Sequence, residues 1–187
     1  MDFYNEKGDI IDYTKYETCE INQANKYVKP DDCVLELGAR YGGVSVAINN
    51  KLNNKRNQVS VEPDKLVWDA LEKNIKNNNC EIELIKGTIS KNKQKIIGKG
   101  WGTRTVAGGD IDNYEIPKKP FNVLIADCEG FLETFYRENT EFFKQLRLVI
   151  FEKDAPKKCD YDFIIAELLR LGFKEQKGSF HSVFIKD

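Results

Sequence analysis

The chain has 187 residues, 41% of them hydrophobic, which is enough for one well-filled core. Charged residues make up 32% of the sequence, yet the formal net charge is only −1. A surface so evenly charged creates no overall field to draw the chain onto nucleic acid or a membrane. No apolar run is long enough for a membrane span, and the first ten residues lack the pattern of a secretory signal, so we expect a soluble, cytoplasmic protein.

The cysteines give no sign of a structural framework. There are five of them, without a CxxC pair, and the chain has a single histidine. An odd number at irregular spacing argues against both a disulfide framework and a structural zinc site. We therefore expect free, mostly buried thiols, and we note Cys128 because it stands inside a motif described below.

The first half of the chain alternates between helix and strand patterns. A short helix within residues 16–32 should stop before Pro30, because proline disfavours helix in the residue ahead of it. Residues 1–29 are thus expected to form an N-terminal helical segment. The elements predicted next are a strand over 33–38, a helix over 42–52, a strand over 58–63 and a helix over 64–79 with Asp64 as its N-cap.

The second half continues this alternation. The predicted elements are strands over 81–90, 121–130 and 147–154, and helices over 132–146 and 161–173. The last helix is indicated by the spacing of Ile165, Leu168 and Leu169 and should end at Gly172. Two short β-prone runs around Gly178 form a closing hairpin. The pattern predicts one α/β domain over residues 1–187, with a mainly parallel seven-stranded sheet, helices on both faces and an antiparallel C-terminal strand.

A glycine-rich turn, VLELGARYGG, follows the first core strand. Ligands of such sheets bind outside the carboxyl ends of the strands, and glycines let the backbone turn sharply and a ligand come close. Helix amides after the turn can also face the ligand. The dinucleotide fingerprint GxGxxG lacks its second glycine here, and the carboxylate of Glu36 would repel a phosphate. Glu36 instead suits a ligand with a positive charge near the turn.

A second acidic residue, Glu62, ends the next strand roughly 20 residues further on, where a carboxylate can accept hydrogen bonds from both hydroxyls of a ribose. A nucleoside with an ammonium group and no phosphate fits this pattern, and that ligand is S-adenosylmethionine. Its adenine is expected near Thr88 and Ile89, unless that stretch is only a turn. The predicted cofactor residues are Glu36, Gly38, Ala39, Arg40, Tyr41, Gly42, Ser45, Glu62, Pro63, Thr88, Ile89 and Asp127.

At these residues the sequence resembles the class I methyltransferases, and more narrowly the FkbM-type family. VLELGARYGGVSV is similar to that family's first motif and VSVEPD to its second. IADCEGFLE is similar to a fourth motif of the form KIDVEGxE and keeps Asp127 and Glu129, although Ala126 and Cys128 depart from it. The resemblance covers approximately residues 27–187. It implies a Rossmann-like class I methyltransferase fold and O-methylation, commonly of a sugar or another small hydroxylated molecule, with S-adenosylhomocysteine as product.

Methyl transfer to a hydroxyl needs in-line positioning and a group that accepts the hydroxyl proton. Asp127, at the tip of the fourth strand, is the first candidate base, and Glu152, at the tip of the fifth, is the second. Alternatively, Asp127 orients the methionine amine, while Glu129 and Glu133 stabilise the start of the following helix. Asp127, Glu152 and Asp154 also form a candidate Mg²⁺ site, because hard cations take oxygen ligands, so metal dependence stays open.

Residues 91–115 are the least regular stretch and the predicted substrate-covering loop. Trp101 can stack on a sugar or a base, and Arg104 can bind a phosphate or carboxylate. The alternative is a solvated loop that the tryptophan anchors to the core. His181 is a further candidate for the acceptor site, with an edge position in the last strand as the alternative. The remaining candidates for the acceptor pocket are Glu129, Tyr13 and Tyr16.

Three other functions compete with transfer to a small-molecule or glycan hydroxyl. An RNA methyltransferase could receive a nucleotide on Trp101, but DCEG stands where an amine-methylating NPPY-like motif would be, and the surface is not basic, so nucleic acid is not the expected partner. A non-catalytic module that only binds S-adenosylmethionine is the second. An NAD-dependent enzyme is the third, and the glycine spacing disfavours it.

Overall fold

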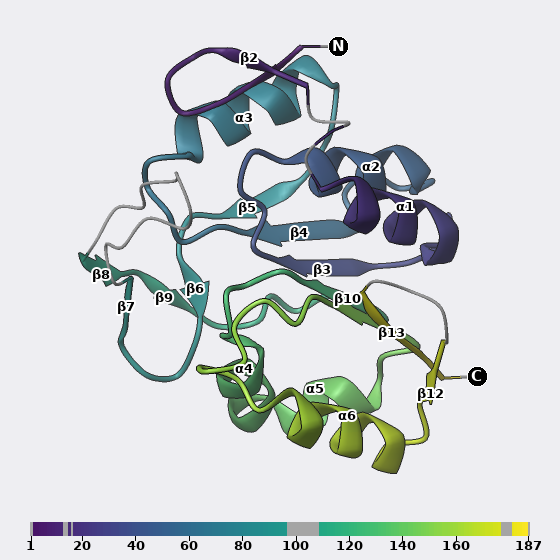
Figure 1. Cartoon of the computed structure of the whole chain (residues 1–187). Helices are drawn as coiled ribbons and strands as arrows, with labels where there is room; N and C mark the ends of the chain where they lie inside the picture. The colour runs from purple at the N-terminus through teal and green to yellow at the C-terminus, as the bar shows by residue number, and fades with distance from the viewer. Residues whose placement is uncertain (1, 13–14, 16, 97–108, 177–180, 187) are drawn as a thin grey trace.

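The computed structural model describes the whole chain except residues 1, 13–14, 16, 97–108, 177–180 and 187 (Figure 1). Its centre is a sheet of seven strands in the order β12-β13-β11-β10-β3-β4-β5. These strands are β3 (Val34–Leu37), β4 (Gln58–Val61), β5 (Glu83–Ile85), β10 (Val123–Ala126), β11 (Leu148–Phe151), β12 (Lys174–Glu175) and β13 (Ser182–Ile185). All neighbouring pairs are parallel except the two that involve β13. The predicted α/β architecture, including its antiparallel C-terminal strand, is confirmed.

Helices cover both faces of the sheet (Figure 1). On one face lie α1 (Thr18–Tyr27) and α2 (Gly43–Lys51), and on the other lie α4 (Leu132–Glu138), α5 (Thr140–Lys144) and α6 (Tyr161–Arg170). The remaining helix, α3 (Trp68–Asn77), contacts the strand β1 near the N-terminus. The strands outside the central sheet are β1 (Phe3–Tyr4), β2 (Ile10–Ile11), β6 (Thr88–Ile89), β7 (Gln94–Ile96), β8 (Gly109–Ile111) and β9 (Asn113–Tyr114).

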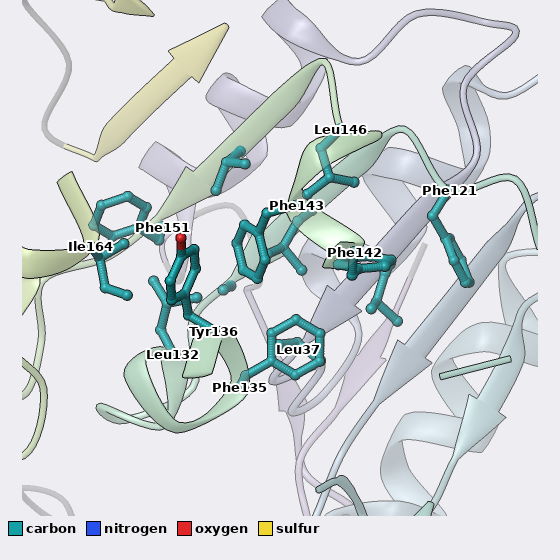
Figure 2. Close-up of a cluster of buried hydrophobic side chains, with 14 of the residues drawn as sticks. Leu37, Phe121, Leu132, Phe135, Tyr136, Phe142, Phe143, Leu146, Phe151 and Ile164 are labelled. Carbon is teal, nitrogen blue, oxygen red and sulfur yellow. The ribbon is translucent and has the colours of Figure 1, made fainter. Parts of the chain in front are cut away.

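Each face of the sheet has its own apolar core, because successive strand residues point to opposite faces. Towards α4, α5 and α6 the core is aromatic, and Phe135 packs edge-on to Phe142 with ring centroids 5.7 Å apart (Figure 2). Towards α1 and α2 it is aliphatic and includes Val34, Ile125 and Ile150. The two faces therefore differ in the kind of apolar side chain that covers the strands.

The predicted strand over residues 81–90 is two separate strands. The first part, β5, belongs to the central sheet, whereas β6 leaves it and pairs in parallel with β9. Gly87 stands at the break, where a Cβ atom would lie 2.4 Å from the carbonyl oxygen of Asp112. The described ends of the predicted irregular loop, 91–115, are also more ordered than predicted, because β7 and β8 pair antiparallel there.

Two predictions about helices need correction. The predicted helix over 132–146 is divided into α4 and α5 at Asn139, whose φ of −136° and ψ of 40° are not helical. Asp64 is not an N-cap, because α3 begins only at Trp68; its Oδ1 atom accepts a hydrogen bond from the Leu66 amide in the preceding turn. The predicted last helix is present as α6, which buries Leu168 and leaves Leu169 51% exposed.

The N-terminal segment is only partly helical. The predicted helix before Pro30 is present as α1, but residues 3–11 contain the antiparallel pair β1 and β2. Asn74 of α3 holds this pair in place, since its side chain accepts a hydrogen bond from the Tyr4 amide (2.8 Å) and donates one to the Tyr4 carbonyl (2.9 Å). The hairpin is thereby fixed beside the helix that follows β4.

Gly38 cannot be replaced without moving the central strands. Its φ is +90°, and a Cβ atom would lie only 1.7 Å from the carbonyl oxygen of Asp127 in the neighbouring strand. We expect Gly38→Ala to lower the free energy of unfolding by roughly 3 kcal/mol or more, through backbone strain and a clash that no rotamer relieves. Urea unfolding followed by circular dichroism measures this. Gly8→Ala is the matched control, because its φ is also positive but a Cβ atom there meets nothing within 4 Å.

Candidate active site

Three ionisable side chains lie side by side at one end of the central strands. Asp127 follows β10, Glu152 follows β11, and His181 directly precedes the antiparallel β13. The register places the adjoining strand residues opposite one another, so these three form the next row across the sheet. This row lies at the carboxyl ends of the parallel strands, where ligands of α/β sheets bind.

A small cavity opens between this row and the helix α1. Asp127, Glu152 and His181 line it together with Glu20 of α1 and Glu36 of β3. Its volume is about 10 Å³, room for about one water molecule. Both predicted bases and the predicted acceptor residue His181 therefore face one confined space with further carboxylates.

Glu36 is a buried carboxylate in the middle of the sheet, between the apolar strand β10 and Ser60 of β4. It is 1% exposed, and its neighbour across the sheet in β10 is Ile125. Its Oε2 atom accepts hydrogen bonds from the hydroxyls of Ser45 (2.6 Å) and Ser60 (2.5 Å). Its Oε1 atom has no hydrogen-bond partner. A buried carboxylate oxygen without a partner is costly, so Glu36 is suited to a cationic or N–H group of a ligand.

The burial of Glu36 should make stability depend on pH. Burial raises the pKa of Glu36 from 4.5 to about 7, so the folded protein binds this proton more tightly than the unfolded chain. The ligand-free protein should therefore lose stability as the pH rises from 4.5 to 7, by roughly 3 kcal/mol for this group. We expect Glu36→Gln to be more stable than wild type at pH 8 and similar to it near pH 4. Urea unfolding at both pH values tests this. The prediction is wrong if Glu36→Gln and wild type differ in stability by the same amount at pH 4 and at pH 8.

The glycine turn after β3 is held by its own hydrogen bonds. Gly38, Arg40 and Gly42 all have positive φ, of 90°, 45° and 86°. The Gly38 amide donates to the carbonyl of Val61 (2.9 Å), and the Arg40 amide donates to Oε2 of Glu62 (2.6 Å). Amides that are bonded within the protein do not cradle a phosphate. This arrangement counts against a dinucleotide and agrees with the glycine spacing.

Glu62 has a structural task that the sequence did not suggest. It is 5% exposed, and its two carboxylate oxygens accept hydrogen bonds from the amides of Arg40 and Asp64 (2.7 Å). Burial raises the pKa of Glu62 to about 7. A carboxylate oxygen can accept a second hydrogen bond, so contact with ribose hydroxyls is compatible with this anchoring role.

Several carboxylates gather in and around this row, with His181 beside two of them. Burial, followed by the charges of Glu152 and Asp154, raises the pKa of Asp127 to about 9. Burial, followed by the charge of Glu20, raises the pKa of Glu152. Shifts of this sign mean that a positive charge in the cavity would be stabilised. The candidate Mg²⁺ ligands Asp127, Glu152 and Asp154 have carboxylate oxygens within 4.8 Å of one another, although they are distant in sequence.

Six further predicted cofactor residues do not line this cavity. The hydroxyl of Ser45 is used by Glu36, and Ala39 is 2% exposed. Tyr41 lies against the Arg40 guanidinium, 4.8 Å from its ring centroid. Pro63 is partly exposed after β4. Thr88 and Ile89 are buried in β6, beyond the central sheet.

The predicted acceptor residue Glu129 and two further residues of its motif, Cys128 and Glu133, lie in different surroundings. Glu129 is exposed in the turn after β10, with φ +53°. Glu133 accepts a hydrogen bond from the Asp160 amide (2.7 Å) and so fixes the loop before α6. Cys128 packs against the aromatic core, and burial raises the pKa of its thiol well above the ordinary value. Trp101, Arg104, Tyr13 and Tyr16 lie outside the described residues.

Two acidic residues, Glu20 in α1 and Glu17 directly before it, lie close to the acidic row and were missed in the sequence. Glu20 lies 2.9 Å from Nε2 of His181, measured from its Oε1 atom. Glu17 directly precedes α1 and has φ +53°. Its carboxylate lies against Gly43 at the start of α2, since a Cβ atom added to Gly43 would be 2.8 Å from Oε2 of Glu17. The helical pattern predicted α1 itself, but no sequence signal says which helix covers the strand ends.

Comparison with known proteins adds information on the fold. No protein-family model matches this chain, and no curated protein matches it. Among solved structures, the precorrin-6y C5,15-methyltransferase of Geobacter metallireducens GS-15 is similar with a TM-score of 0.58 and 12% identity, over 95% of this chain and 90% of that one. An rRNA methylase of Streptococcus thermophilus has a TM-score of 0.53 and 10% identity, over 88% and 90%. A methyltransferase of Pyrococcus furiosus has a TM-score of 0.51 and 18% identity, over 89% of this chain and 82% of that one.

The chain has the class I methyltransferase fold. The predicted Rossmann-like architecture is thus confirmed by these structural neighbours, which are by name two methyltransferases and an rRNA methylase. Within the described residues, no helix has the length and apolar character needed to cross a membrane. Asp127, Glu152 and His181 place ionisable side chains at the end of the sheet where ligands bind in folds of this kind.

Proposed function

We propose that the protein is an O-methyltransferase that uses S-adenosylmethionine and acts on a hydroxyl of a sugar, a glycan or another small hydroxylated molecule, in the manner of the FkbM-type family. The observation that carries this proposal is the buried Glu36, whose Oε1 atom has no partner and which lines the cavity together with Asp127 and Glu152. A cavity lined by carboxylates favours a cationic ligand. A cytoplasmic location remains a prediction from the sequence.

The cofactor fits this donor set by charge. When bound, S-adenosylmethionine supplies an electrophilic methyl group on a sulfonium centre. In our proposal, Oε1 of Glu36 accepts a hydrogen bond from its amine, and Glu62 accepts hydrogen bonds from the ribose hydroxyls with the acceptor capacity that the backbone leaves. Both residues sit on rigid strand ends, so the cofactor is oriented without a large ordering cost.

Asp127 is the proposed proton acceptor. Asp127 would accept the proton of the acceptor hydroxyl as that oxygen takes the methyl group that bound S-adenosylmethionine would supply, with S-adenosylhomocysteine as the other product. The sulfonium charge counteracts the burial that raises the pKa of Asp127 to about 9, and so favours the ionised form when the cofactor is bound. Glu152 is the second candidate for this role, and Mg²⁺ held by Asp127, Glu152 and Asp154 is the alternative use of the same acids.

Ligand binding is the first test of this proposal. Isothermal titration calorimetry with S-adenosylmethionine, S-adenosylhomocysteine, NAD and ATP separates the competing classes. We expect both sulfur nucleosides to bind with one site per chain and the two phosphate ligands to give no heat of binding. Binding of NAD alone would contradict the proposal, and binding of S-adenosylmethionine without transfer to any acceptor would favour a non-catalytic module.

RNA methylation is a second candidate. One structural neighbour is by name an rRNA methylase. Beside the site, a groove of about 600 Å³ is lined by Lys153, Lys157 and Lys158, but also by Asp160 and Asp162, which would repel a phosphate backbone. Incubation with labelled S-adenosylmethionine and either total RNA or a panel of glycans and small hydroxylated metabolites, followed by mass spectrometry, distinguishes the two. We expect label in the hydroxylated molecules and none in RNA.

A further inference from the structure

We propose that Glu20, Glu152 and His181 form a binding site for one divalent transition-metal ion in the cavity at the carboxyl edge of the sheet. The three ligands come from different elements: α1, the end of β11 and the start of β13. Their nearest ligand atoms all lie within 4.8 Å of one another. Nε2 of His181 is 2.9 Å from Oε1 of Glu20 and 3.9 Å from Oε1 of Glu152.

The burial of the three ligands suits an ion site. The side chain of His181 is 1% exposed, that of Glu20 is 13% exposed and that of Glu152 is 26% exposed. The carboxylates of Glu20 and Glu152, which both lie near His181, repel each other unless a proton or a cation lies between them. A divalent ion on the three ligand atoms would neutralise both carboxylates at once.

A separate observation points to an occupant of this cavity. Oε1 of Glu36 is buried, has no hydrogen-bond partner and belongs to a residue that lines the same cavity. The cavity of about 10 Å³ holds about one water molecule, which matches the volume of a bound ion or its water ligand. A water on the ion could donate a hydrogen bond to Oε1 of Glu36 in addition to the cofactor amine, because a carboxylate oxygen can accept two hydrogen bonds.

The donor set indicates the class of metal. One imidazole with two carboxylates suits Mn²⁺, Fe²⁺ or Zn²⁺, whereas an all-oxygen set favours Mg²⁺. The all-oxygen set Asp127, Glu152 and Asp154 competes for Glu152. Asp154, however, does not line the cavity, whereas Glu20 and His181 do. These contacts favour the set that contains the histidine.

The role of the ion in catalysis rests on the proposed function, but its binding does not. An ion at this site lies beside Asp127 in the same cavity, where it would lower the pKa of an acceptor hydroxyl and assist the transfer of its proton to Asp127. Ion binding can therefore be measured without cofactor, acceptor or turnover. If the ion binds but no methyl transfer occurs, the site stands and the proposed function fails.

The test is metal binding by the full chain after treatment with a chelator and dialysis. Mn²⁺ titration followed by electron paramagnetic resonance, and Zn²⁺ and Mg²⁺ titrations followed by calorimetry, give stoichiometry and affinity. We expect one Mn²⁺ or Zn²⁺ per chain and much weaker Mg²⁺ binding. His181→Gln and Glu20→Gln should each weaken Mn²⁺ binding by roughly 100-fold or more, because even changes around the ligands cost about 10–100-fold.

Asp154→Asn discriminates between the two sets of ligands, and we expect it to bind Mn²⁺ with wild-type affinity. Thermal unfolding keeps the test valid if a variant is less stable: Mn²⁺ should raise the Tm of wild type and of Asp154→Asn, but not that of His181→Gln. The proposal is overturned if wild type binds no ion at millimolar concentration. It is equally overturned if Asp154→Asn loses the ion while His181→Gln retains it.

Discussion

Asp127→Asn should lower kcat for methyl transfer by roughly 10²–10⁴-fold, the usual contribution of a positioned acid or base. The amide cannot accept the hydroxyl proton, although it keeps the size of the side chain. Affinity for S-adenosylmethionine should change by less than about tenfold at pH 7, because in the free protein burial and the neighbouring acids already hold the carboxyl in its protonated form, with a pKa of about 9. Single-turnover kinetics and calorimetry on the same preparations measure the two quantities.

Proton release gives an independent readout of Asp127. Since the cationic cofactor favours the ionised carboxylate, its binding at pH 7 should release protons, and its affinity should rise with pH up to about 9. Calorimetry in buffers of different ionisation enthalpy measures the number of protons released. Asp127→Asn should release fewer than wild type. An equal loss of cofactor affinity and rate in this variant would instead make Asp127 a cofactor ligand.

Glu62→Ala should weaken S-adenosylmethionine binding by roughly 10²–10³-fold. The substitution removes the charged acceptor proposed for the ribose hydroxyls, and hydrogen bonds to charged groups contribute about 1.5–3 kcal/mol each. It also frees the amides of Arg40 and Asp64, so the glycine turn loses its anchor. Calorimetry with S-adenosylmethionine and with S-adenosylhomocysteine should show the same loss, because both share the ribose.

Glu62→Gln separates the two tasks of this residue. Its amide oxygen can still accept one backbone hydrogen bond, so the glycine turn should be less disturbed than in Glu62→Ala. We expect an intermediate loss of cofactor affinity and a Tm closer to that of wild type. Wild-type cofactor affinity in Glu62→Ala would show that the ribose lies elsewhere.

The sequence predicted the local features of this protein well where a short pattern has a single physical meaning. Buried runs such as VLEL and LVIF became β3 and β11, and the C-terminal run became an antiparallel strand beside β11. The boundaries that failed depend on distant contacts. β6 leaves the central sheet to pair with β9, which comes more than twenty residues later in the chain. Asn139 divides a pattern whose apolar spacing alone fits one helix.

The site shows the same division. The amino-acid sequence by itself determined the layered α/β architecture and which acids stand at the strand ends, among them Glu36, Asp127 and Glu152, because strand periodicity and glycine turns are local properties. Only the tertiary structure decided that His181 lies beside Glu152, that Glu20 of α1 faces both, and that Glu62 anchors the glycine turn. Those contacts join residues up to 161 positions apart. They depend on strand order and on how a helix packs across the sheet edge, and no short-range pattern encodes either.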